Sequence, residues 1–119
     1  MQIKIKNKNY DLNFGVRFVR ELDKLAGMKV KQNGIEQSFG MGITMTMPSL
    51  RQYDPATLAT VLYCATWDNA KRPSLNDIDD FIDDSDTDLI KLFDNVLTEM
   101  NKANAVKVVV SKMPKNTKA

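Results

Sequence analysis

The residues best suited to hold a cation lie in one acidic run, DIDDFIDDSDTD, at residues 77–88. Calcium loops place oxygen ligands at alternate positions, with a glycine at the turn and a glutamate at the end. This run contains no glycine, and its apolar residues Ile78, Phe81 and Ile82 recur at helical spacing. We therefore interpret it as the solvated acidic face of a helix, which could also dock a basic partner.

Histidine is absent from the sequence, and Cys64 is the one cysteine. These two facts remove the usual Cys/His zinc sites and the Ser–His and Cys–His nucleophilic systems. Cys64 fits a small buried residue of a protein in a reducing compartment. We predict no enzymatic activity, no cofactor and no metal site.

The stretch FGMGITMTMP, residues 39–48, is rich in methionine. A thioether copper site would normally recruit histidine or cysteine as well, and neither lies nearby. Alternating apolar residues favour a strand, but Gly40 and Gly42 weaken one and Pro48 cannot lie in a central ladder.

Drawn as a helix, the same stretch has two apolar sides. One side carries Met41, Met45 and Pro48, and the other carries Ile43, Met47 and Leu50. We favour the helix over the strand, and such a helix needs contacts on both sides. Methionine is flexible and polarizable, which suits a surface that accepts apolar partners.

Charge is segregated along the chain, although the net charge is only +2. Residues 1–35 carry eight Lys or Arg and three acids, residues 76–99 carry nine acids and one lysine, and five lysines follow Glu99. These blocks could attract one another within the fold or between copies. Without a stacking aromatic platform or a helix-turn-helix pattern, the basic residues do not favour nucleic-acid binding.

The first half of the chain predicts a β-hairpin and then a helix. IKIK and YDLNF alternate around a polar turn at Asn7-Lys8-Asn9, and a helical period then runs from Phe14 through Phe18, Leu22 and Leu25 to a stop at Gly27. VKQNGIEQ contains the turn signal Asn33-Gly34 and predicts a loop or a second small hairpin.

The second half predicts three more helices after the methionine-rich segment. Asp54-Pro55 begins one that runs to about Asn69, and Ser74 with Asp77 begins a shorter one with Leu75, Ile78, Phe81 and Ile82 inside. The last follows Ser85-Asp86-Thr87, with an inner stripe of Leu89, Leu92 or Phe93, Val96, Leu97 and Met100, and it could continue into VKVVV.

These elements predict a mainly helical α+β fold, with an N-terminal β-hairpin packed on a bundle of four to five helices. At 119 residues the chain predicts one domain, residues 1–110, followed by a flexible basic tail, residues 111–119. No apolar run approaches the roughly 20 residues of a membrane span, and the N-terminus is charged, so we expect a cytoplasmic protein with no membrane contact.

Three segments in this order resemble the tail assembly chaperones of long-tailed phages and prophages of Gram-positive bacteria. They are IKIKNKNYDLNFGVRFVRELDKLAG, FGMGITMTMPSLRQYDPATLATVLYCAT and RPSLNDIDDFIDD. The likeness spans about residues 2–100 and includes no catalytic motif. It implies a protein of the host bacterial cytoplasm that is absent from the mature virion.

The resemblance also implies partners. Members of that family bind the long helical tape measure protein, keep it soluble and assist tail tube assembly. They also self-associate into rings or spirals, and a longer form made by programmed frameshift would reach the major tail protein. We hypothesise that Met41, Met45 and Met47, with Phe39 and Ile43, line the groove for the tape measure helix. A structural or DNA-binding component of the phage particle is the alternative.

Overall fold

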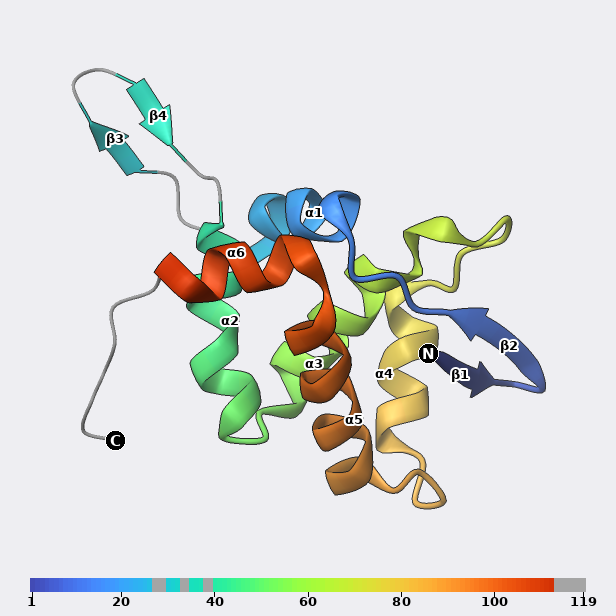
Figure 1. The fold of residues 1–119 in the computed structure, drawn as a ribbon. Coiled ribbons are helices and arrows are strands. Elements are labelled where there is room, and N and C mark those ends of the chain that lie inside the picture. The colour runs from blue at the N-terminus through green and yellow to red at the C-terminus, as the bar shows by residue number, and fades with distance from the viewer. Residues whose placement is uncertain (27–29, 33–34, 38–39, 113–119) are drawn as a thin grey trace.

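The computed structural model describes residues 1–26, 30–32, 35–37 and 40–112, and for β3 and β4 the backbone alone. The described residues form two hairpins and six α-helices (Figure 1). In chain order these are β1 (Gln2–Ile5), β2 (Lys8–Asp11), α1 (Val16–Ala26), β3 (Val30–Gln32), β4 (Ile35–Gln37), α2 (Met41–Arg51), α3 (Pro55–Ala65), α4 (Leu75–Asp83), α5 (Leu89–Lys102) and α6 (Asn104–Lys112). The predicted fold class, mainly helical α+β with an N-terminal hairpin, is confirmed.

The last predicted helix is divided into α5 and α6, so the described chain has six helices rather than four or five. Ala103 has extended backbone angles (φ −76°, ψ 128°), and its N–H bonds to the Met100 carbonyl instead of continuing the helix. The predicted tail begins inside α6, which ends at Lys112, and residues 113–119 lie outside the described part.

The N-terminal hairpin turns one residue earlier than its sequence suggested. Lys6 and Asn7 both have positive φ, and Ile5 pairs with Lys8, so the predicted turn Asn7-Lys8-Asn9 is wrong. A two-residue turn with two positive φ angles matches the twist of the strands better. The hairpin buries Ile3 and Ile5 toward the helices, and the β1 strand contacts α4.

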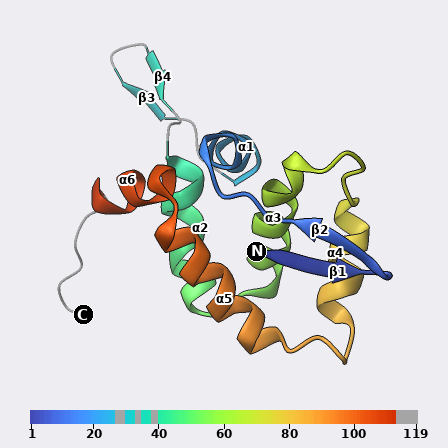
Figure 2. The same ribbon diagram turned by 45° about the vertical axis from the view of Figure 1, so that its right-hand side comes forward.

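Helix α3 is the centre of the bundle (Figure 2). It contacts α1, α2 and α4, and most of its circumference is buried by apolar side chains. Its start agrees with the prediction, because Asp54 accepts the Ala56 N–H and Pro55 takes the first helical position. Its buried residues are Leu58, Ala59, Val61, Leu62, Cys64 and Ala65.

Helix α3 ends at Ala65, four residues before the predicted end, and continues as a short 3₁₀ turn, Thr66–Asp68. The carbonyls that would extend it have other partners. The Ala65 carbonyl accepts the Asn13 N–H (2.9 Å), and the Tyr63 carbonyl accepts the Thr66 hydroxyl (2.7 Å). One tertiary and one local hydrogen bond therefore take the carbonyls at the point where the sequence pattern alone would continue the helix.

Helix α1 begins two residues after the predicted start. The Asn13 side chain accepts the Gly15 N–H (3.0 Å), while Phe14 packs edge-on against Phe18 with ring centroids 5.0 Å apart. Phe18 and Leu22 are buried, but Leu25, which fits the same apolar period, is 59% exposed.

The remaining helices follow the predicted signals. Ser74 and Asp77 form a reciprocal capping box at the start of α4, and Asp88 caps α5. The inner faces bury Ile78, Ile82, Leu92, Phe93, Val96 and Met100. Leu75 is the exception, since it is 46% exposed at the first position of α4.

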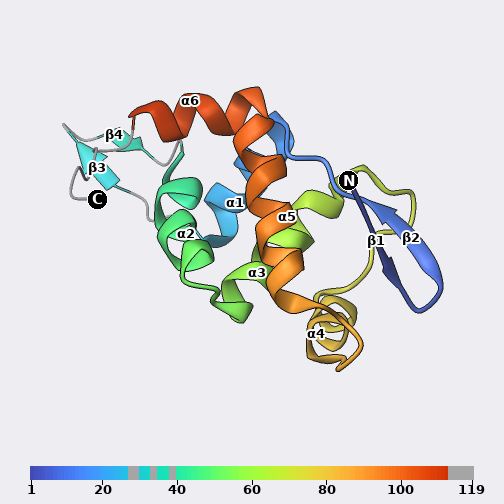
Figure 3. The same ribbon diagram turned by 60° about the horizontal axis from the view of Figure 1, so that its bottom comes forward.

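The second hairpin is confirmed by the antiparallel pairing of β3 with β4, although its turn residues 33–34 are outside the described part. Seen from below, α2, α5 and α6 surround one side of the bundle and the two hairpins lie at opposite ends (Figure 3).

Candidate partner-binding surface

The methionine-rich segment is a helix, α2, so the helical interpretation is confirmed and the strand is excluded. Gly40 has a positive φ of 77° immediately before α2. The Asp23 carboxylate of α1 accepts the Gly40 N–H (2.9 Å) with one oxygen and the Gly42 N–H (2.8 Å) with the other. These are N–H groups that a helix start leaves without an intrahelical partner. Asp23 therefore fixes the start of α2 to α1.

Gly42 brings the backbones of α1 and α2 into direct contact. A Cβ atom built there would lie 2.6 Å from both the carbonyl carbon and the carbonyl oxygen of Leu22. A β-carbon at Gly40 would lie 3.0 Å from the Val109 side chain of α6. The two glycines therefore allow α2 to pack close to α1 and α6. From the sequence alone they served only as arguments against a strand.

The two apolar sides predicted for this helix are present. Ile43, Met47 and Leu50 are fully buried in the core. On the opposite side Met45 is 44% exposed, Pro48 is exposed and Met41 is half-buried. We call Met41, Met45 and Pro48 the α2 outer face.

The five predicted partner-binding residues are thus divided by the structure. Met41 and Met45 lie on the outer face, whereas Ile43 and Met47 are core residues that a partner could reach only by opening the fold. Phe39 lies outside the described residues. Sequence reasoning missed Asp23, for which the only available signal was an acid late in the preceding helix.

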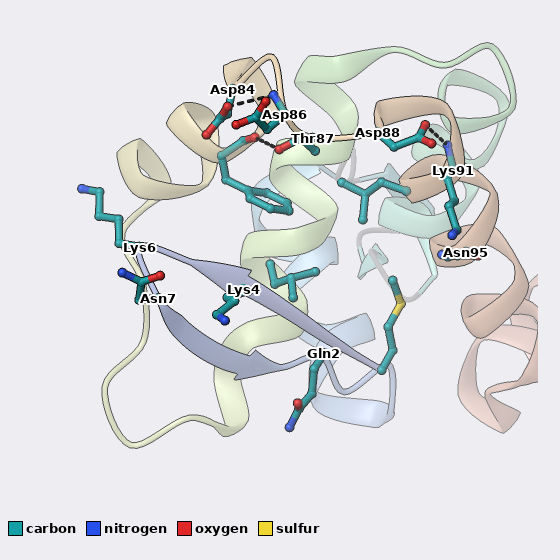
Figure 4. Close-up of a pocket in the computed structure, with 14 residues that line it drawn as sticks. Gln2, Lys4, Lys6, Asn7, Asp84, Asp86, Thr87, Asp88, Lys91 and Asn95 are labelled. Atoms are coloured by element: carbon teal, nitrogen blue, oxygen red, sulfur yellow. Dashed lines mark hydrogen bonds between the residues drawn. The ribbon is translucent and has the colours of Figure 1, made fainter.

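A hollow of mixed charge lies elsewhere, between β1 and the connection from α4 to α5 (Figure 4). It has a volume of about 700 Å³ and is lined by both signs of charge. Lys4 and Lys6 come from the hairpin, and Asp84, Asp86 and Asp88 from the opposite rim. The Asp84, Thr87 and Asp88 side chains there bond to backbone N–H or carbonyl groups. They therefore serve as local turn and helix caps.

Cys64 lies in a second cluster of side chains that could do chemistry, but each of them is buried or bonded within the fold. Burial, and secondly the negative charge of Glu21, raises the pKa of the Cys64 thiol to about 12. Arg72 donates to Glu21 and to the Tyr63 carbonyl, and its guanidinium stacks over the Tyr63 ring at 4.0 Å. At neutral pH this thiol is protonated, so it is a weak nucleophile.

Within the described ranges, no group of three or more His, Cys, Asp or Glu residues is arranged to hold a metal ion. None of the helices described there is both long and apolar enough to cross a membrane.

Comparison with known proteins gives one finding. Neither a curated protein nor a solved structure matches the chain. A family model described as "Phage tail assembly chaperone protein, TAC" matches residues 2–115, nearly the whole length. The chain belongs to this family of phage tail assembly chaperones.

Proposed function

We propose that this protein is a non-enzymatic chaperone that binds the helical tape measure protein, keeps it soluble and assists assembly of the tail tube. It acts in the host bacterial cytoplasm and is absent from the mature virion. Membership of the tail assembly chaperone family supports the general role. The tape measure protein as partner is our extension of that role.

The observation that carries the proposal is the α2 outer face. Met45 is 44% exposed at the middle of α2, with Met41 one turn before it and Pro48 nearly one turn after it. An amphipathic helix binds such a surface through apolar residues spaced at i, i+3, i+4 and i+7. Methionine side chains adapt to many apolar shapes, which suits a long partner whose sequence changes along its length.

Because Ile43 and Met47 are buried, we restrict the proposed contacts with the partner to the exposed side of α2. Met41 and Met45 contact the partner helix in this proposal, while Ile43 and Met47 support them from the core. Phe39 keeps its place in the hypothesis because it adjoins Gly40 at the start of α2.

Each copy needs to bind only weakly. Many copies engage one long chain, and repeated engagement of a tethered chain raises the overall avidity. Self-association of the copies into a ring or spiral, and a longer frameshifted form that contacts the major tail protein, complete the proposed role.

The test is co-purification of a tagged tape measure protein with Met45→Asp or Met45→Lys. Both variants place a charge in the apolar contact, so both should lose most of the bound partner whatever the sign of the charge. Because Met45 is on the surface, both variants should fold with a circular dichroism spectrum like that of the parent.

Ile90→Asp is the matched control, because it makes the same kind of change at an exposed apolar residue of α5 that is not part of the α2 outer face. It should retain the partner. Full binding by both Met45 variants would exclude the α2 outer face, and presence of the protein in purified virions would contradict a purely assembly role.

A further inference from the structure

Two short helices of this chain carry exposed faces of opposite charge. On α4, Leu75, Asp79 and Asp83 follow one another at intervals of one turn, and all three are exposed. On α6, Lys107, Val108 and Lys112 are exposed on one side of the helix. We call these the acidic face and the basic face.

The two faces match in composition as well as in charge. Each contains two like charges and one half-exposed apolar side chain, which is Leu75 (46% exposed) on α4 and Val108 (50% exposed) on α6. Both helices have nine residues. At 1.5 Å per residue the acidic face extends about 12 Å along α4, and the basic face extends about 7.5 Å along α6.

The acidic face destabilises α4 as long as no basic partner covers it. Asp79 and Asp83 are like charges at i and i+4, an arrangement that destabilises a helix. Asp83 also lies in the last turn, where α4 has no basic residue and the helix dipole favours a cation. A basic partner would relieve both effects.

Other charges do not neutralise these faces within the described part of the chain. Lys6 pairs with Asp77 (3.0 Å), and with Lys4 it lines a small hollow beside Asp80 and Asp84. Asp79 and Asp83 lie outside that hollow, and none of the ion pairs among described residues includes them, Lys107 or Lys112.

The faces cannot meet within one monomer. In all three views α4 and α6 lie on opposite sides of α5 (Figures 1–3). A contact between two different surfaces of identical chains is heterologous, and it produces a ring or an open helix rather than a closed pair.

We propose that the occupant of the acidic face is the basic face of a second copy of this chain, so that copies associate head to tail through α4 and α6. The contact rests on the self-association included in the proposed function and names the surfaces that would form it. Its test requires no tape measure protein. The contact is small and charged, so it should be weak and sensitive to salt.

Sedimentation velocity of the purified full chain tests the proposal. At about 0.1 M salt the average mass should rise with protein concentration, and at about 1 M salt, where the Debye length falls to about 3 Å, it should return toward the monomer. Asp79→Lys/Asp83→Lys and Lys107→Glu/Lys112→Glu should each weaken the association constant by about tenfold or more, because attractive pairs become repulsive.

The decisive sample is an equimolar mixture of the two reversed variants. Each variant restores the missing charge of the other, so the mixture should associate although neither component does. Lys8→Glu/Lys71→Glu is the control for Lys107→Glu/Lys112→Glu, because it makes the same change in net charge at exposed residues outside α4 and α6. It should associate like the parent.

Three results would overturn the contact: a parent protein that stays monomeric at low salt, reversed variants that associate like the parent, or a mixture that does not recover. Met45→Asp separates this contact from the proposed function. It should self-associate normally while losing the tape measure protein.

Discussion

Substitution of Gly42 by alanine adds one carbon atom at the point where α1 and α2 touch. That atom would lie 2.6 Å from the Leu22 carbonyl carbon and oxygen and 2.8 Å from the Asp23 nitrogen. All three are backbone atoms of α1, so no side chain can rotate to make room. The two helices must move apart, and the hydrogen bonds from Gly40 and Gly42 to Asp23 must lengthen.

The expected loss of stability is larger than the gain from better helix propensity. Overpacking costs about 1–3 kcal/mol, and a weakened hydrogen bond to a charged group costs about 1.5–3 kcal/mol. Against these losses, alanine stabilises a helix interior by about 1 kcal/mol relative to glycine. We therefore expect Gly42→Ala to lower the free energy of unfolding by about 1.5–5 kcal/mol, or the Tm by roughly 6–20 °C for a chain of this length.

Urea and thermal unfolding followed by circular dichroism measure this change. Ser49→Ala is the control, because Ser49 is a half-buried residue of the same helix and its substitution improves helix propensity. It should leave the stability equal or slightly higher. A Gly42→Ala protein as stable as the parent would refute the close contact between α1 and α2.

Two further predictions concern titration. Cys64 should resist alkylation at pH 8 in the folded protein and react once urea unfolds the chain, because burial keeps its thiol protonated with a pKa of about 12; rapid labelling without denaturant would contradict its burial. The hydrogen bond from Lys6 holds the pKa of Asp77 below its ordinary value, so the stability from this pair is present above that ordinary value and is lost as the pH falls through the lowered pKa. An NMR titration should show the Asp77 midpoint rising in Lys6→Ala, and an unchanged midpoint would mean that the pair does not form in solution.

Local signals in the sequence were sufficient for most of the helix starts. Asp54-Pro55 and the Ser74–Asp77 capping box each place the partner of an exposed N–H within three residues, so no distant contact is needed to recognise them. The two apolar sides of α2 followed in the same way from helical spacing.

Features set by distant residues could not be predicted. The Asn13 N–H donates to the Ala65 carbonyl at the end of α3, although the two residues are 52 positions apart in the sequence. Leu25 fits the apolar period of α1, yet its position in the bundle leaves it exposed. Asp23 acts on the start of a helix 17 residues away, and a single sequence carries no signal for that contact.

In the proposed function, the backbone contact at Gly42 and the exposed methionines of α2 have complementary consequences for binding. A helix held by its backbone against α1 does not need to be ordered when a partner arrives, so less of the binding energy is spent on ordering. Met41 and Met45 have flexible side chains on that fixed support, which under the proposed function would allow different apolar sequences to pack on the same face. Gly42→Ala should therefore weaken stability and binding together, whereas Met45→Asp should weaken binding alone. If the two variants changed stability and binding in the same proportion, the α2 outer face would be part of the core and not a separate binding surface.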